Sequence, residues 1–150
     1  MLFKQNIFLL SLFLLATSCG HSHGDGREKV LDGFADAYFN YDFQTAAQFC
    51  SPESSKWLRY EASQMTQADV DRLASKGFGA AHSIVDVENL SDSLAQYTLD
   101  VNDYYATAAL DSVGRVVDHM LFKVSLRRRN NNWEVVLDSP LRPYKPYQNK

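Results

Sequence analysis

The 150-residue chain contains only two cysteines, Cys19 and Cys50, and carries no excess of basic residues. At this length, one domain can bury a core without disulfides or metals. Fifteen lysines and arginines against 18 acids give a formal net charge of -3. The chain has no basic excess, so a nucleic-acid partner is not indicated. It also has no sustained basic amphipathic stretch, so a membrane-surface helix is not indicated either. We therefore expect no nucleic acid among its partners.

Catalytic signatures are also missing. The chain has no Gly-x-Ser-x-Gly, no phosphate-binding glycine loop, no His-Glu-x-x-His and no Cys-x-x-Cys. His21 and His23 form a pair, but zinc sites use three or four protein ligands. We therefore expect no metal and no cofactor. The possibility of a small enzyme, whose site consists of two or three scattered residues, stays open.

An apolar run from Ile7 to Ala16 is the longest in the chain and follows Lys4. It is too short to span a membrane and is typical of a secretory signal. The next residues, Ala16-Thr17-Ser18-Cys19, resemble the bacterial lipobox, in which the cysteine thiol is acylated and becomes the new N-terminus. The alternative is an ordinary signal-peptidase site, which leaves Cys19 free to pair with Cys50 in an oxidising compartment.

These features predict four segments. Residues 1–18 are a lipoprotein signal peptide, 19–26 the lipidated cysteine and a flexible tether, 27–138 a single α+β domain, and 139–150 a proline-rich tail. We expect export and anchoring to a bacterial membrane, inner or outer, with the domain in the periplasm or at the cell surface. The tail has proline at every third position, which favours polyproline II. Docking on its own domain, or disorder, is favoured over docking on a partner.

The first half of the domain has helical spacing. Apolar residues recur three or four positions apart in two runs, from Val30 to Tyr41 and from Phe43 to Cys50. Ser51-Pro52-Glu53 predicts the start of a further helix. Thr66 to Asp69 resembles a capping box, and Gly77 is a plausible end of that last helix.

From His82 onward the period is two, as in strands. Three hairpins keep apolar residues opposite apolar residues, with connections at Ser91–Ser93, Ser112–Val113 and Asn130–Asn131. Their predicted pairs include Val87–Tyr97, Val85–Leu99, Leu99–Leu126 and Leu126–Val135. The chain therefore predicts a four-stranded antiparallel meander, curved because its middle strands are long.

Two acids, Asp103 and Asp118, interrupt the apolar face in this register, opposite Phe122 and Thr107. An acid that points into an apolar cup can act as a general base, because burial raises its pKa. The favoured alternative places Asp103 at a bulge and Asp118 beyond the sheet edge in water. A slip of one residue would reverse every side chain.

Tyr97 and Tyr105 share the apolar face and are candidates to hydrogen-bond a ligand oxygen.

The other face of the third strand carries His119, Lys123 and Arg127, and this pattern predicts a solvated face. The run Arg127-Arg128-Arg129 suggests an anion patch, but alternation sends neighbours to different faces beside a turn. We expect solvated charges instead, with Arg128 against Trp133.

Helices followed by a long-stranded meander resemble the nuclear transport factor 2-like, or cystatin-like, superfamily. The segments that carry the resemblance, Phe34–Glu53 and Asn132–Val136, look like the opening and the last strand of small Bacteroidetes lipoproteins of this type. The resemblance implies a curved sheet wrapped around a helix to form a conical cavity. Its members include small enzymes and many non-catalytic domains, so fold analogy alone assigns no activity.

Three functions follow as expectations. The first is a non-catalytic envelope domain that binds a small apolar ligand or another protein. The second is a cofactor-free isomerase, lyase or hydrolase that uses Asp103 or Asp118 with a tyrosine. The third is a structural or dimerising module, against which the polar outer face counts.

Overall fold

The computed structural model describes residues 26–107 and 113–145, so the predicted signal sequence and Cys19 lie outside the described residues. The helices are α1 (Arg27–Tyr38), α2 (Phe43–Ala46), α3 (Ser55–Gln64) and α4 (Gln67–Ser75), with 3-10 turns at Ala47–Phe49 and Pro52–Ser54. The strands are β1 (Ala81–Ser91), β2 (Leu94–Ala106), β3 (Arg115–Arg129) and β4 (Asn132–Val136). Across these two described ranges, no helix has the length and apolar character to span a membrane.

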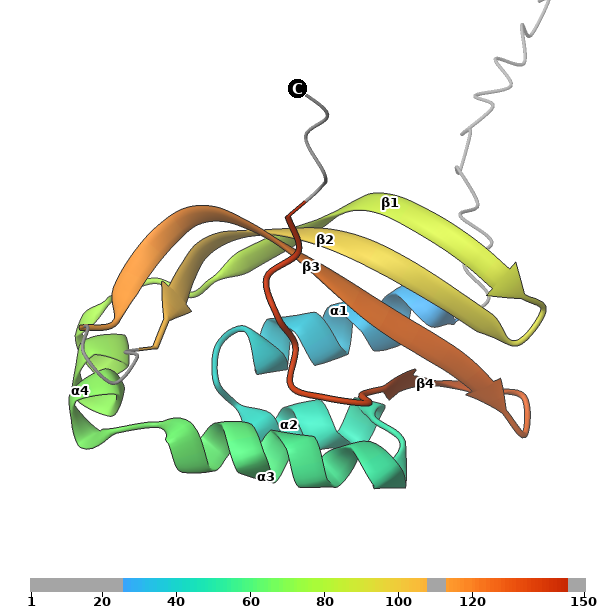
Figure 1. The fold of residues 1–150 in the computed structure, drawn as a ribbon, viewed down its shortest axis with the longest axis horizontal. Helices are drawn as coiled ribbons and strands as arrows, with labels where there is room; N and C mark the ends of the chain where they lie inside the picture. Colours follow the sequence, from blue (N-terminus) through green and yellow to red (C-terminus); the bar gives the residue numbers. More distant parts are fainter. Residues whose placement is uncertain (1–25, 108–112, 146–150) are drawn as a thin grey trace, which may run out of the picture.

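The four strands form one antiparallel sheet in the order β1-β2-β3-β4. The sheet arches over the helices (Figure 1). Helix α1 lies beneath the arch, α2 and α3 form a further layer, and α4 stands at the end where β2 finishes and β3 starts. The predicted α+β architecture, with helices first and a curved meander after them, is confirmed.

Side chains fill the space between α1 and the sheet. Helix α1 buries one face because its apolar residues recur at helical spacing, and alternate residues are buried from Ala95 to Val101 in β2 and from Phe122 to Leu126 in β3. Together they build one core, whose most buried large members are Leu31, Phe34, Phe39, Leu99, Val101, Phe122, Val124 and Leu126. The Phe39 and Phe122 rings lie 4.8 Å apart between their centroids. The concave side of the sheet is therefore a packed core.

The strand register corrects two of the three predicted hairpins. Val87 pairs with Tyr97 as predicted, but Leu99 faces Ile84 rather than Val85, because the register shifts between Ile84 and Asp86. That shift leaves Val85 as an extra residue in a bulge. The β1–β2 connection is otherwise where the sequence places it.

The β2–β3 register is displaced by four residues from the prediction. Leu99 faces Phe122 rather than Leu126, so Phe122 is not opposite Asp103. Apolar residues alternate along both strands, so a slip of four still matches apolar with apolar. Because side chains alternate with a period of two, a displacement by an even number of residues leaves each side chain on its predicted inner or outer face.

The last hairpin has the predicted register, with Leu126 opposite Val135. Asn130 and Asn131 adopt φ values of 50° and 65°, as a two-residue hairpin turn requires. Beyond β4, the tail folds back on its own domain. The backbone N–H of Tyr144 donates to the carbonyl of Leu121 at 2.6 Å, so the described part of the tail covers an edge of β3.

Candidate functional site

The residues predicted to line a cup are not gathered around one opening. Hollows of about 370, 390 and 350 Å³ lie between the end of α1 and the segment after α4, beside the β1–β2 turn, and between α2 and α3. None of these three is lined by Tyr97, Tyr105, Asp103 or Asp118. Tyr97 is 3% exposed and belongs to the core. Its predicted contact with a ligand stays a prediction.

Tyr105 is buried at the end of the sheet that α4 covers. Its hydroxyl donates to Oδ1 of Asp69 at 2.8 Å. The other oxygen of Asp69 accepts from the backbone N–H and the hydroxyl of Thr66, at 3.0 and 2.6 Å. The predicted capping box is therefore confirmed, and its acid is also the contact between α4 and β2. Burial, followed by the hydrogen bond to Asp69, raises the pKa of Tyr105.

Two further tyrosines lie beside this contact. The Tyr41 hydroxyl donates to the carbonyl of Tyr105 and lies 3.3 Å from the Tyr104 hydroxyl. The Tyr41 and Tyr104 rings are stacked, with centroids 6.3 Å apart. Burial raises the pKa of both phenols. The Tyr41 hydroxyl donates within the protein and the Tyr104 hydroxyl is its neighbour and an acceptor, so the cluster stabilises the fold in the described structure.

The two acids proposed for chemistry lie on neighbouring strands. Asn102 pairs with His119 and Tyr104 with Val117, so the ladder skips the intervening Asp103 and Asp118. Asp103 has φ 54°, a left-handed conformation that is uncommon for a non-glycine residue in a strand. Asp118 is exposed. The favoured alternative places Asp103 at a bulge and Asp118 beyond the sheet edge in water. The register is the same on both sides of Asp103, so the irregularity there is not a bulge, and Asp118 is solvent-exposed but lies within β3.

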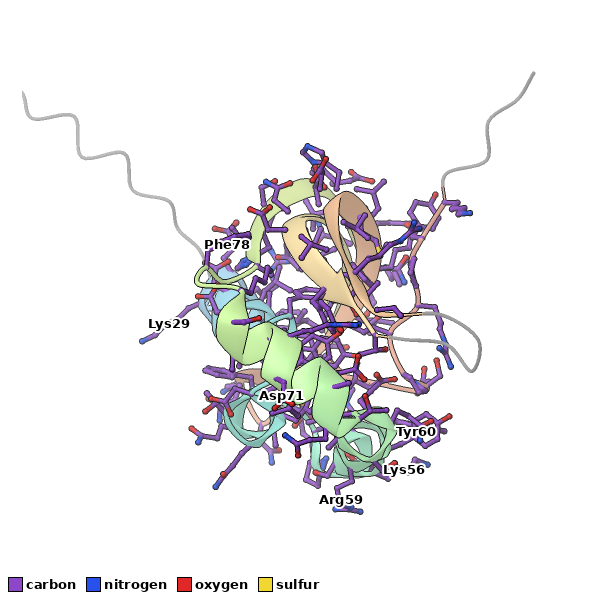
Figure 2. The ribbon with its side chains drawn as sticks, turned by 90° about the vertical axis from the view of Figure 1, so that its left-hand side faces the viewer. Lys29, Lys56, Arg59, Tyr60, Asp71 and Phe78 are labelled. Carbon is purple, nitrogen blue, oxygen red and sulfur yellow. The ribbon has the colours of Figure 1, made fainter. Side chains whose placement is uncertain are left out.

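Lys76, which no sequence motif marks as a site residue, lies against Asp103. Its Nζ donates to the backbone carbonyl of Asp103 and is 4.9 Å from the centroid of the Phe78 ring. Burial lowers the pKa of Lys76, and the Asp103 carboxylate partly offsets this effect. Phe78 is 57% exposed and lies at the surface beside α4 (Figure 2). No local pattern marks Lys76, because its partner is 27 residues away.

The edge strand β1 is the most exposed apolar element. Its four large hydrophobic side chains are exposed by 38–53%, namely Ile84, Val85, Val87 and Leu90. The register shifts twice along the strand, after Ile84 and after Asn89, so Val85 and Leu90 are extra residues in bulges. The alternation in the sequence predicts Val85 and Val87 on the core face, but both are exposed, and the bulge at Val85 could not be predicted from the alternation.

His82, near the start of this exposed strand, attaches β1 to α1. Its Nε2 lies 3.0 Å from Asp32 and its Nδ1 lies 3.3 Å from Asp36. The two carboxylates contact opposite sides of the ring, so they do not converge on one point. Within the described ranges, no group of three or more His, Cys, Asp or Glu side chains is arranged to hold a metal ion.

Comparisons with known proteins provide little support. No protein-family model matches the chain. No curated protein matches it either. Among solved structures it is similar to an "Ntf2 like protein involved in plasmid conjugation", with 13% identity and a TM-score of 0.34 over 82% of this chain. The aligned region spans about half, 51%, of that protein. At that TM-score the likeness supports no conclusion, and the fold assignment rests on the strand pairing and helix order described above.

Proposed function

We propose that this chain is an exported, lipid-anchored binding protein, whose domain takes an extended segment of a partner protein along β1. The observation that carries the proposal is the exposure of Ile84, Val85, Val87 and Leu90 on one edge strand. The anchor is proposed from the lipobox-like residues that end at Cys19.

Edge strands present unpaired backbone N–H and C=O groups, and proteins protect them with charged side chains, proline, β-bulges or a covering segment. Strand β1 has two bulges and two exposed acids, but its 11 residues include no lysine or proline. Among the described residues, no segment pairs with its outer edge. An extended peptide could add one strand there, with backbone hydrogen bonds for affinity and the exposed apolar side chains for packing.

Charge defines the partner further. Asp86 and Glu88 are exposed on β1, and Asp92 follows in the turn. The strand's only basic side chain, His82, is already placed between Asp32 and Asp36. The complementary segment is therefore apolar and basic, because opposite charges on paired strands attract and like charges repel.

Binding is preferred over catalysis because of where the candidate groups lie. Tyr97 is in the core, Tyr105 is hydrogen-bonded to Asp69, and Asp118 is exposed. A small apolar ligand would have to displace the packed core to reach the concave face. Neither the acids nor the tyrosines line one of the three hollows.

Titration with two synthetic peptides tests the β1 site. One peptide alternates valine with lysine and the other alternates valine with glutamate. We expect the lysine peptide to bind, with amide chemical-shift changes confined to residues 81–93 in NMR spectra. The double variant Asp86→Lys, Glu88→Lys should reverse the preference. Asp71→Lys, on the exposed surface of α4, is the matched control and should leave it unchanged (Figure 2). A preference that survives the double reversal would rule the site out.

Mass spectrometry of the N-terminus tests the anchor separately. The chain expressed in a bacterium should lose residues 1–18 and carry acyl groups on Cys19, and it should partition with membranes. Cys19→Ser should abolish the acylation, whereas Cys50→Ser should not. A mature N-terminus without acyl groups would contradict the anchor and leave the β1 site untouched.

A further inference from the structure

Three consecutive arginines end β3, and they divide between two environments. Arg127 lies 2.8 Å from Glu134 and 3.7 Å from Glu53. Arg129 lies 3.4 Å from Glu53 and 3.8 Å from Glu134. These two arginines are on one face of the strand and are neutralised there by the two glutamates. Their charges contribute little to binding an external anion.

Arg128 points to the other face, because side chains alternate along a strand. Its guanidinium lies 5.8 Å from the centroid of the Trp133 ring, as the sequence predicts. Within residues 26–107 and 113–145, no acid lies within 4.0 Å of it. Its positive charge is therefore not paired with a carboxylate of this part of the chain.

A second guanidinium shares the same tryptophan. Arg27, the first residue of α1, lies 5.2 Å from the Trp133 centroid and donates to Oδ1 of Asn89. Arg27 and Arg128 line one hollow of about 390 Å³ with Asn89, Ser91 and Asp92. Both guanidiniums bring positive charge to the lining of this hollow, which favours an anion inside it. Stacking on the indole also limits their rotamers in advance of binding.

The start of α1 adds to the positive potential. Its N-cap is Gly26, which has no side chain to accept hydrogen bonds from the first N–H groups of the helix. Those groups and the helix dipole favour a negative charge close to Arg27. Among the described residues, Asp92 is the one carboxylate that lines the hollow, and it opposes a highly charged anion.

We infer that this hollow, the Arg27–Arg128 site, binds a phosphate-type oxyanion. Guanidinium groups bind phosphate through two parallel N–H donors, and serine and asparagine side chains supply neutral hydrogen bonds. The phosphate has two plausible sources, a free phosphate or phosphomonoester and a phospholipid headgroup. The second source rests on the proposed anchor, because the site lies at the start of the domain, directly after the predicted tether.

Protection from the arginine reagent phenylglyoxal tests the site on the full lipidated chain. In detergent, inorganic phosphate should slow the modification of Arg128, read by mass spectrometry of its peptide. Arg129 in the same peptide is the internal control, because its partners are Glu53 and Glu134. We expect Arg27→Gln to weaken the protection of Arg128 by about tenfold in phosphate concentration, as loss of a charged hydrogen-bonding partner implies. Asp92→Asn should strengthen it severalfold.

Vesicles distinguish the two sources. If the headgroup is the ligand, Arg128 should be protected in vesicles that contain phosphatidylglycerol, without added phosphate, and not in vesicles of phosphatidylcholine alone. If free phosphate is the ligand, protection should follow added phosphate in both. Equal protection of Arg128 and Arg129, or no response to Arg27→Gln and Asp92→Asn, would overturn the site. The hollow includes Asn89 and Ser91 at the end of β1, but none of these readings requires a peptide paired with β1, so failure here is distinguishable from failure of the peptide titration.

Discussion

The hydroxyl of Tyr105 donates a 2.8 Å hydrogen bond to Asp69, and this contact joins strand β2 to helix α4 across 36 residues of sequence. Asp69 is 1% exposed, although it caps a helix whose other residues are mostly exposed. A buried carboxylate is costly unless its oxygens accept hydrogen bonds, so Tyr105 and Thr66 are what make this position tolerable. This hydrogen bond is therefore one of the polar contacts that hold α4 against the end of the sheet.

Removing that donor should destabilise the domain. Tyr105→Phe keeps the ring and leaves Oδ1 of Asp69 without this partner, which should lower the free energy of unfolding by about 1–3 kcal/mol. Urea denaturation measures the loss. Tyr60→Phe is the control, because Tyr60 is 43% exposed, and it should change stability by less than about 0.5 kcal/mol. Equal effects of the two variants would show that the Tyr105 hydroxyl contributes nothing specific.

Gly33 on α1 should not accept a larger residue. A Cβ at this position would lie 2.3 Å from Cζ of Phe49, far inside van der Waals contact. We expect Gly33→Ala to lower the free energy of unfolding by about 1–3 kcal/mol through overpacking, despite the better helix propensity of alanine.

A second substitution should identify the cause. Adding Phe49→Leu removes the ring atoms that the new methyl would meet, so Gly33→Ala should cost less in that background than in the wild type. A double-mutant cycle by thermal and urea denaturation measures the coupling. Additive effects would contradict the steric explanation.

The turn between β3 and β4 should prefer residues that tolerate positive φ. Asn131, with φ 65°, is the second residue of that turn. Asn131→Gly should raise the free energy of unfolding slightly or leave it unchanged, because asparagine-glycine is the preferred pair for such turns. Asn131→Val should lower it by about 1–2 kcal/mol, because a β-branched residue is strained there. Thermal unfolding followed by circular dichroism measures the stability of the two variants. A valine variant more stable than the glycine variant would contradict a turn with positive φ at Asn131.

Alkaline pH should weaken the fold before the tyrosines titrate. Burial raises the pKa of the half-buried Cys50 thiol from 9.0 to about 12. Between these values the unfolded chain has lost a proton that the folded chain retains, so the free energy of unfolding falls as pH rises above about 9. Burial raises the pKa of Tyr41 in the same direction, which adds a further loss above about 10.

Cys50→Ala separates the two groups. This variant should lose the part of the pH dependence that begins near 9 and retain the part that begins near 10, as measured by urea denaturation from pH 7 to 11. Tyr41→Phe should retain the part that begins near 9 and reduce the part that begins near 10, to which the buried Tyr104 and Tyr105 also contribute. A stability that stays constant up to pH 10 in the wild type would contradict the raised pKa of the thiol.

The second hairpin shows the limit of pattern matching. Leu99 finds an apolar partner at either Phe122 or Leu126, so the alternation of β2 and β3 permits both registers. The choice depends on where the connection between the strands closes and on which ring packs against Phe39. Both features depend on residues far apart in the sequence. The Asn130-Asn131 turn depends only on neighbouring residues, and the register that it sets was predicted correctly.

The sequence by itself determined the order of helices and strands, the capping box at Thr66, the Asn130-Asn131 turn and the inner and outer faces of β2 and β3. These features depend on periodicity and on residues a few positions apart. The tertiary structure alone decided that Tyr105 meets Asp69, that Lys76 meets the Asp103 carbonyl, that β1 stays exposed, and that Arg27 joins Arg128 at Trp133. Each of these depends on how far one element extends over another, and that distance is set by packing across tens of residues.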